Sequence, residues 1–380
     1  MYSYVRAVCG IFAIGIQKTS NMITLLQSLP ATCFSSCIPD VIYSFTPSSG
    51  DIDDASRIGT TVTITIDGKE IFSERFFPVD GKITLAELDR LLTPYARQNL
   101  SINLTIKIEE DDDVWEDGEG TATISSKIIY CEADINTPAT DFINTHFLTM
   151  LDGEKQTALN RLEYLHYIGT DKASVIAEYD DGTTKEFSLS PVGGNSRYTT
   201  IDVTPSKFVS DTDSCLLGFW VQAGQRKFRF SIDLDEPDCA PILVFENSFG
   251  CDELLYCTGT HTVAPTYKRS QGYIGKFNRN YEIAETRTFK ADTGFLTFAM
   301  ANWADELFRS KSIHVVNFKD GHPNVGKEVI VTDSKSEYNN NDESMPRFTF
   351  SYQYAQRNHN VFDTLRSGRI FDNTFDNTFE

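Results

Sequence analysis

The sequence predicts a mainly β protein, in which two tandem β-sandwich-like modules precede an α+β block of strands around one helix. Two stretches share one pattern: an alternating run, an Asp-Gly turn, a second run, a loop and a strictly alternating strand. The first comprises Thr60–Ile66, Asp67-Gly68, Glu70–Phe77 and Leu100–Ile108; the second comprises Lys172–Tyr179, Asp181-Gly182, Thr183–Leu189 and Lys227–Leu234. Hydrophobic residues make up 40% of the chain and aromatic residues 12%, which is typical of a folded, strand-rich protein.

The first module shows how the strands are assigned. Val62 and Ile64 alternate with threonines, which is the period of a half-buried strand. Asp67-Gly68 supplies the positive φ angles of a type I′ turn, so the next run is expected to fold back as a hairpin. A capping box over residues 84–87 predicts a helix, with apolar residues on one face. These residues are Leu85, Leu88, Leu91, Leu92 and Tyr95, and we expect Pro94 to limit the helix to about three turns.

Polar, Pro-containing segments at Glu132–Thr140 and Asp233–Pro241 mark the expected domain boundaries. The predicted divisions are an N-terminal segment (1–37), a β-module with one helix (38–135), a second β-module (136–238), an α+β domain (239–358) and a flexible tail (359–380). The tail contains the repeat from Phe371 to Phe379, which we interpret as a frayed end, with an aromatic strap on a neighbouring subunit as the alternative.

The N-terminal segment allows two interpretations. Arg6 followed by Ala7–Ile16 resembles a signal peptide, but no small-x-small cleavage site follows, and the run is too short to span a bilayer. Met22 offers an alternative start, which would make residues 1–21 an over-extended reading frame. No other segment has the length and apolar character of a membrane span, so the remainder is expected to be soluble.

The net charge limits the classes of partner, and the cysteine content indicates the redox state of the thiols. The formal net charge of −20 argues against nucleic acid or anionic lipid as the main partner, since both carry phosphates that an acidic surface repels. Eight cysteines are spread over a chain long enough to fold without disulfides, so we expect mostly reduced thiols. They are Cys9, Cys33, Cys37, Cys131, Cys215, Cys239, Cys251 and Cys257.

Two groups of residues are candidate metal sites. Eight carboxylates lie within Glu109–Glu119, but they lack the alternate spacing and glycine of a calcium loop, so a solvated loop is favoured. Trp115 within this run is either a cap on the core edge or an exposed contact. Cys239, Cys251, Cys257 and His261 offer zinc-preferred ligands without the paired spacing of a structural zinc site, so buried thiols are favoured.

No catalytic motif is found in the sequence. The six histidines (146, 166, 261, 314, 322 and 359) show no paired metal-ligand spacing, and no serine lies in a Gly-x-Ser-x-Gly elbow. Gly193-Gly194-Asn195 is a turn without the helix start that phosphate binding needs. We therefore predict no catalytic, cofactor-binding or metal residue; a glycan-active enzyme with acids from distant strands is a minor alternative.

The third block combines short strands with one strong helix. Its expected elements are Ile242–Phe245, Tyr281–Ala284, a helix around Thr297–Arg309 with Trp303, Leu307 and Phe308 inward, Val329–Val331, and a ladder of Phe348, Phe350, Tyr352 and Tyr354. Tyr267, Tyr273, Tyr281 and Tyr338 lie in polar surroundings. Such tyrosines are either strand-edge residues or contacts for a sugar or a protein.

The third block resembles a known group of proteins in the order of its elements and a few residues. These are Asn247-Ser248-Phe249, Tyr281-Glu282-Ile283, Glu285-Thr286, Trp303–Phe308, Val331–Ser334 and Asp342 before Phe348–Tyr352. Over about residues 240–356 the chain is similar to prophage-encoded tail or baseplate structural proteins of the distal tail or hub type. The resemblance implies a non-enzymatic ring subunit of a phage tail tip or a related contractile injection particle, made in the cytoplasm and incorporated into the particle.

On this interpretation the partners are other copies of the chain and other tail or baseplate proteins, without nucleic acid or membrane insertion. The alternative is an exported cell-surface adhesin or carbohydrate-binding β-sandwich protein, for which glycan contact through exposed tyrosines and oxidised cysteines are expected.

Overall fold

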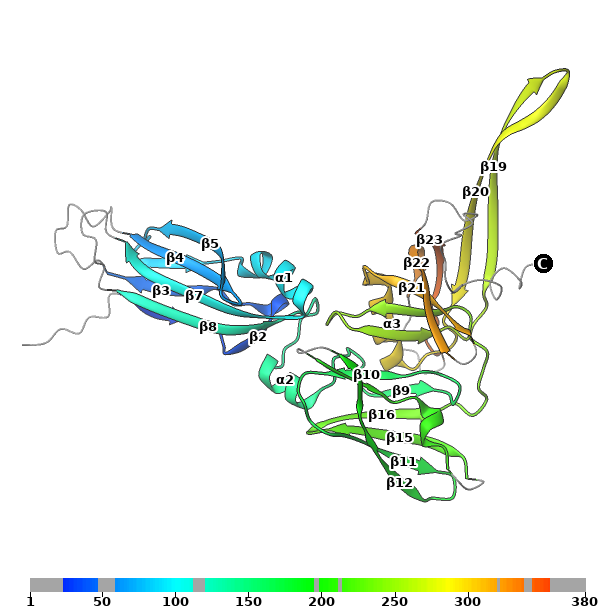
Figure 1. The fold of residues 1–380 in the computed structure, drawn as a ribbon, viewed down its shortest axis with the longest axis horizontal. Coiled ribbons are helices and arrows are strands. Elements are labelled where there is room, and N and C mark those ends of the chain that lie inside the picture. Colours follow the sequence, from blue (N-terminus) through cyan, green and yellow to red (C-terminus); the bar gives the residue numbers. More distant parts are fainter. Residues whose placement is uncertain are drawn as a thin grey trace, which may run out of the picture. The chain divides into compact units, whose positions relative to one another are not determined.

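The computed structural model describes residues 23–46, 59–111, 120–194, 198–210, 214–319, 322–337 and 344–355 (Figure 1). The chain is mainly β, with several sheets and sandwich-like modules, which confirms the predicted fold class. It divides into two compact units. The first unit comprises the described parts of Met1–Ala31, Ile38–Leu91 and Ile102–Lys127; the second comprises those of Thr32–Cys37, Leu92–Ser101 and Ile128–Glu380.

Several predictions fall outside the described residues. They concern the N-terminal segment before Ile23, the acidic run after Asp111 with Trp115, Asn195, Tyr338, His359 and the C-terminal repeat. The predicted domain boundaries stay predictions.

The first unit contains two small sheets. One has the order β1-β3-β6, and in the other β8, β7, β4 and β5 lie side by side in that order. The bounds are β1 Ile23–Gln27, β3 Val41–Phe45, β4 Gly59–Ile66, β5 Lys69–Phe76, β6 Lys82–Leu85, β7 Ser101–Asp111 and β8 Thr121–Ile129. The hydroxyls of Tyr43 and Thr60, 2.6 Å apart and both buried, link β3 to β4.

The predicted ladders and turns of both modules are present. Val62 on β4 and Ile106 on β7 are fully buried, as the alternation predicts. Asp67 and Gly68 both have positive φ (49° and 81°) between the paired residues Ile66 and Lys69, which confirms the two-residue turn. In the second module only Gly182 of the Asp181-Gly182 pair has positive φ, because the last strand pair is Glu178 with Thr184 and the loop is longer.

The predicted helix start at residues 84–87 is wrong. Thr84 and Leu85 end strand β6, and Glu87 has a φ of 58°, which a capping-box residue inside a helix cannot have. Helix α1 spans Leu88–Asn99 and passes through Pro94. Leu92 and Ala96 are fully buried, so tertiary packing of this face outweighs the roughly 3 kcal/mol that an internal proline costs.

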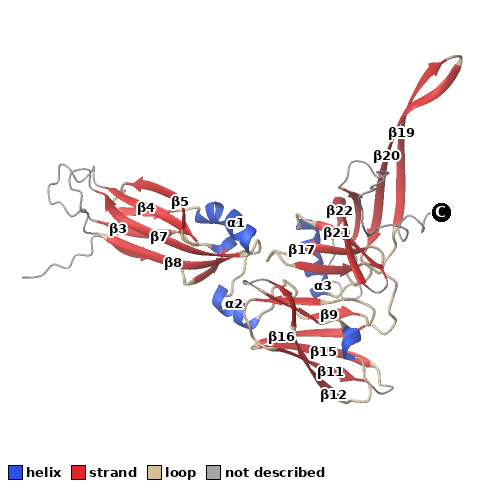
Figure 2. Cartoon of the chain, viewed as in Figure 1, coloured by secondary structure: helices blue, strands red, loops and turns tan. Residues whose placement is uncertain are grey.

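The second unit holds three sheets (Figure 2), in the orders β12-β11-β15-β16-β9, β10-β14-β13 and β18-β17-β21-β22-β23-β20-β19. Its strands are β2 Thr32–Phe34, β9 Glu154–Thr157, β10 Tyr164–Tyr167, β11 Ala173–Tyr179, β12 Thr184–Leu189, β13 Pro191–Gly194, β14 Thr199–Asp202, β15 Leu216–Ala223, β16 Arg226–Ile232, β17 Ile242–Glu246, β18 Asp252–Tyr256, β19 Thr262–Ile274, β20 Phe277–Asp292, β21 Ile313–Lys319, β22 His322–Lys335 and β23 Thr349–Tyr354. Its helices are α2 Ala139–Thr145, α3 Phe298–Arg309 and the short η1 Ser35–Cys37 and η2 Pro205–Phe208.

One hydrophobic core runs through the second unit. It joins Val175 and Phe230 of the second β-module to Phe245, Trp303 and Tyr352 of the third block. Helix α3 contributes Trp303 and Leu307 to this core and begins where the Thr297 hydroxyl accepts a hydrogen bond from the Met300 amide, so the predicted helix is confirmed.

Strands β19 and β20 form a two-stranded ribbon that runs away from their sheet (Figure 1). Strand β20 pairs with β23 only over Phe289–Asp292, whereas its pairing with β19 extends from Lys290 to Phe277. We call residues 264–288 the arm. At about 3.3 Å per residue, the part of β20 paired only with β19 is roughly 40 Å long. The sequence predicted only Tyr281–Ala284 of this ribbon as strand.

Candidate functional site

Two features of the second unit are candidates for a functional site: a buried group of charged side chains and the arm. The buried charge cluster consists of Lys155 on β9, Glu163 before β10, Glu253 on β18, and Trp303 and Glu306 on α3. Lys155, Glu163 and Glu306 are at most 8% exposed. The cluster forms where two strands of the second module meet the third block, so it combines residues far apart in the sequence.

Lys155 and Glu163 form an ion pair inside the cluster. Lys155 Nζ lies 2.6 Å from Glu163 Oε2, and the Thr157 hydroxyl donates to the other carboxylate oxygen at 2.9 Å. Lys155 also donates to the Leu254 carbonyl at 3.2 Å and lies 4.7 Å from the centre of the Trp303 ring. Both charges are therefore compensated, which a buried ion pair requires.

Glu253 is held by side-chain donors from other segments of the chain. The Trp303 indole N–H donates to one carboxylate oxygen, and the Asn247 amide donates to the other at 2.6 Å. Asn247 Oδ1 in turn accepts from the amides of Phe249 and Cys251, which fixes the turn between β17 and β18. Burial raises the pKa of Glu253, while Lys155 and the two donors favour its charged form.

Glu306 is the least satisfied member of the cluster. Ser248 donates to Oε1 from its amide, at 3.2 Å, and from its hydroxyl. The other oxygen, Oε2, has no hydrogen-bond partner among the described residues. Burial, followed by the nearby charge of Glu253, raises the pKa of Glu306 to about 7. The carboxyl group is thus close to half protonated at neutral pH.

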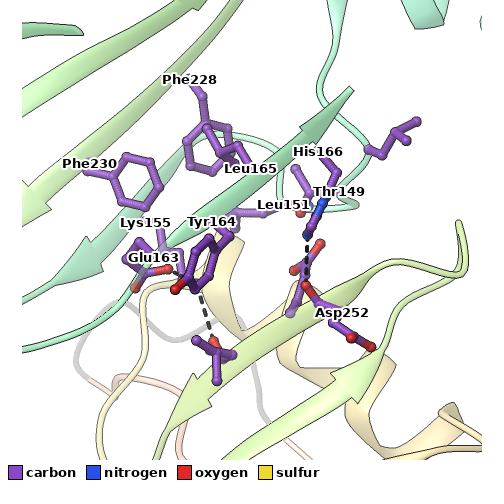
Figure 3. Close-up of a pocket in the computed structure, with 13 residues that line it drawn as sticks. Thr149, Leu151, Lys155, Glu163, Tyr164, Leu165, His166, Phe228, Phe230 and Asp252 are labelled. Atoms are coloured by element: carbon purple, nitrogen blue, oxygen red, sulfur yellow. Dashed lines mark hydrogen bonds and ion pairs between the residues drawn. The ribbon is translucent and has the colours of Figure 1, made fainter. Parts of the chain in front are cut away.

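The cluster borders a cavity that is too small for an organic ligand (Figure 3). Lys155, Glu163, His166, Asp252 and Glu253 are among its lining residues, and its volume is about 20 Å³. This is room for about one water molecule. Glu163, Asp252 and Glu253 line this small space, and the contacts of Lys155 and Glu253 with Trp303 join strands β9 and β18 to helix α3 within the second unit.

His166, which also lines this cavity, is a structural residue. Its Nε2 donates to the Asp252 carbonyl at 3.0 Å, a role that assigns the proton to Nε2 and leaves Nδ1 to accept from the Thr200 hydroxyl at 2.9 Å. Burial lowers the pKa of His166 and so favours this neutral form. Both ring nitrogens are engaged.

The residues considered for zinc are not gathered into a site. Among the described residues no three His, Cys, Asp or Glu side chains are placed to hold a metal ion. Cys251 and Cys257 are almost completely buried, and burial raises the pKa of both thiols, which disfavours the thiolate that zinc binds. His261 instead stacks on Phe289 and Tyr352, with its Nε2 2.9 Å from the Tyr352 hydroxyl.

The arm brings together three of the four tyrosines that the sequence indicated. Tyr267, Tyr273 and Tyr281 are 43%, 73% and 67% exposed. Phe277 and Ile283, which the sequence analysis did not single out as contacts, are 64% and 56% exposed on the same ribbon. The missed signal is the turn at Gly275-Lys276, where both residues have positive φ and close a two-residue hairpin.

Tyr281 occupies a β-bulge. Ser270 pairs with Glu282 and Gln271 with Asn280, so Tyr281 is the extra residue of β20. Its ring lies beside Gly272, where a Cβ atom would be 3.4 Å from the ring edge. The bulge breaks the alternation of β20, which is one reason why the sequence pattern predicted only a short strand here.

Aromatic side chains are present on both faces of the arm. Tyr273 is opposite Asn278, whereas Phe277 is opposite Ile274, and neighbouring residues of a strand point to opposite faces. A ribbon that exposes rings on both faces is suited to being enclosed by a partner.

A shallow polar groove lies at the foot of the arm. Its volume is about 460 Å³, and it is lined by Thr260, Thr262, Lys290, Ala291, Asp292, Asp333, Lys335, Thr349, Phe350 and Ser351. Asp292 is already paired with Arg347, whose Nε lies 2.7 Å from Oδ2. The groove therefore contains Lys290, Lys335 and Asp333 besides this ion-paired aspartate.

Comparisons with known proteins give no family. No family model matches the sequence, and no curated protein matches it. Among solved structures, a plexin A4 extracellular region is 10% identical over 89% of this chain, with a TM-score of 0.18, and the chain spans 40% of that protein. Three titin immunoglobulin domains (I67–I69) are 11% identical over 71% of this chain and 93% of theirs, with a TM-score of 0.20. Scores this low support no argument about fold or function. No helix among the described residues is long and apolar enough to span a membrane.

Proposed function

We propose that this chain is a non-enzymatic structural subunit of a phage tail tip, a baseplate or a related contractile injection particle. It assembles into a ring with other copies of itself and contacts partner subunits. The single observation that supports this proposal best is the arm, which exposes aromatic side chains on both faces. The resemblance of residues 240–356 to tail proteins supplies the kind of particle.

The arm favours assembly because its own contacts give it little stability. None of its described side chains belongs to the hydrophobic core, and an isolated two-stranded ribbon is marginally stable in water. Tyr273, Phe277 and Tyr281 are each about two-thirds exposed, so together they present roughly 300–500 Å². That is about half of what one partner contributes to an interface of standard size.

The buried charge cluster agrees with a structural role for the second unit. The carboxyl groups of the cluster bond to Lys155, Asn247, Ser248 and Trp303, except for Glu306 Oε2, which has no partner among the described residues. The cavity beside them holds about one water.

The test compares the assembly state of the full chain with that of a variant in which Asn-Gly replaces residues 264–288. This replacement keeps the pair Val263 with Phe289 and closes it with a favoured two-residue turn. Light scattering after size exclusion, with electron microscopy, is expected to show closed rings for the full chain and monomers for the shortened one. A full chain that stays monomeric at high concentration contradicts the proposal.

One observation favours an exported adhesin or carbohydrate-binding protein instead. On strand β15, Trp220 is 42% exposed, faces outward opposite Ile176, and lies under the guanidinium group of Arg229 at 5.4 Å. Flat exposed indoles are a common surface for sugar stacking. A glycan array that compares the full chain with a Trp220→Ala variant distinguishes the two proposals. Glycan binding that is lost in the variant favours the adhesin.

A further inference from the structure

We infer that the arm tip, residues 267–281, binds an acidic surface on a second copy of this chain. This inference rests on the proposed function and names the partner and the force that selects it. The arm tip is basic and aromatic, whereas the remainder of the chain is strongly acidic.

The charge separation follows from the sequence. The arm tip contains Lys268, Arg269, Lys276 and Arg279 and no aspartate or glutamate, so its formal charge is +4. The whole chain carries −20, which leaves −24 for all other residues. A positive ribbon on a negative protein is complementary to another copy of that protein, and such complementarity mainly raises the rate and specificity of association.

The basic side chains of the arm tip are not neutralised by the arm. Among the ion pairs of the described residues, none involves Lys268, Lys276 or Arg279. Arg269 lies 5.1 Å from the centre of the Tyr267 ring, a cation–π contact that leaves its charge in place. The ion pair between Glu285 and Arg287 lies towards the base of the arm, outside the arm tip.

The β19 edge of the arm also discourages simple strand addition. Strand β19 is the edge of its sheet, and an unprotected edge would pair with any extended chain. Pro265 lacks the N–H that a further strand would need, and Lys268 and Arg269 place two charges on the same edge strand. Along β19, recognition by the aromatic and basic side chains therefore fits the arm better than an open-ended β-ladder.

Nucleic acid and anionic lipid are the competing acidic partners. Both would have to approach a chain whose other residues sum to −24, and this charge repels phosphates at long range. The same charge attracts the arm of another copy. A second copy is therefore the partner that the charge distribution favours.

The experiment uses a charge-reversed full chain with a matched control. In the arm variant, Lys268→Glu, Arg269→Glu, Lys276→Glu and Arg279→Glu are combined, which changes the formal charge by −8. The control combines Lys69→Glu, Lys82→Glu, Lys172→Glu and Lys227→Glu, which changes it equally at exposed lysines outside the arm. Sedimentation velocity compares both variants with the unaltered chain at about 50 mM and about 500 mM NaCl, where screening differs strongly.

We expect the arm variant to self-associate at least tenfold more weakly than the control, and the unaltered chain to lose affinity at high salt. The arm variant keeps its acidic surface, so the arm of the unaltered chain should still bind it. Labelling the arm variant allows this mixed association to be measured. A photo-crosslinking residue at position 273 should join two copies of the chain. The residue that it attaches to in the second copy should lie near acidic residues.

Other outcomes overturn the inference in distinguishable ways. If both variants form the same rings as the unaltered chain, the proposed function stands and the arm-tip inference fails. If the arm variant loses binding to phosphatidylglycerol vesicles or to single-stranded DNA while its self-association is unchanged, a membrane or a nucleic acid replaces the second copy. If the unaltered chain shows no self-association, the proposed function falls as well.

Discussion

Phe289 and Tyr352 are cross-strand partners whose rings stack with centroids 4.9 Å apart and planes 14° apart. They mark the position where β20 leaves the seven-stranded sheet to become the arm. Both rings are almost completely buried, and His261 stacks on each of them. The arm is therefore anchored by an aromatic stack at its base, while the arm tip is surrounded by solvent.

The first prediction concerns this anchor. Phe289→Ala removes a buried ring that contacts Tyr352, Tyr354 and His261, and we expect it to lower the free energy of unfolding by about 3–5 kcal/mol. Phe277→Ala, at the exposed end of the same strand, should change it by less than about 0.5 kcal/mol. Urea denaturation followed by tryptophan fluorescence measures both. Equal effects of the two substitutions would show that Phe289 is not an anchor.

The second prediction concerns pH. The pKa of Glu306 is about 7 in the folded chain and about 4.5 when unfolded, so the folded state binds more protons between these values. Its contribution to stability is therefore fully present below about pH 4.5 and is lost as the pH rises through 7. From this shift the loss is on the order of 3 kcal/mol between about pH 4.5 and pH 8.

Glu306→Gln removes this titration and keeps an oxygen to accept from Ser248. We expect the variant to be more stable than the unaltered chain at about pH 8, by about 1–3 kcal/mol, and to lack the decline. Asp305→Asn, on the exposed side of the same helix, is the control and should retain it. Comparing the two variants cancels the opposite effect of His166, whose lowered pKa costs stability as the pH falls. Parallel curves for all three proteins would contradict the assignment.

The third prediction concerns Arg226, which is 1% exposed. Its guanidinium group pairs with Asp171 at 2.7 Å and donates to the carbonyls of Ile143 and Ile168. Arg226→Ala leaves these acceptors without their donor, and we expect a loss of about 3–5 kcal/mol. Arg229→Ala on the same strand removes the pair with Glu178. The Arg229 side chain is 19% exposed instead of 2%, so the loss should be about 1 kcal/mol or less in chemical denaturation. Similar losses for the two would refute a bridging role for Arg226.

The fourth prediction concerns coupling between Lys155 and Glu163. Lys155→Met leaves the Glu163 carboxylate buried without its cation, and Glu163→Gln leaves the ammonium group without its anion. Each single change should cost about 3–5 kcal/mol, and the double variant less than the sum of the two. A double-mutant cycle from urea denaturation gives the coupling. Additive losses would mean that the two charges act independently.

Elements with a regular hydrophobic period could be predicted from the sequence. Val62 and Ile106 on their ladders, the Asp67-Gly68 turn and the helix capped by Thr297 each follow from local preferences that tertiary packing reinforces. Helix α1 was misplaced because Thr84 and Glu87 fit a capping box, while the residue between strand and helix adopts a left-handed conformation that the sequence does not reveal.

The sites were less visible, for two physical reasons. Lys155, Glu253 and Glu306 come from three distant segments, and each alone looks like an ordinary surface charge, because no spacing rule connects residues that only the core brings together. The arm lacks alternation because both of its faces are exposed, so its strands carry no buried period to detect. From the arm the sequence predicted only the strand Tyr281–Ala284 and the tyrosines as candidate contacts.

The separation between an anchored base and an independent ribbon has an evolutionary consequence. Residues 264–288 contribute no side chain to the hydrophobic core, which Phe289 joins and Val263 packs against, and Thr288 at the base accepts a hydrogen bond from Gln353. Exchange of this single hairpin between related chains would therefore change the specificity for a partner subunit and create new pairings.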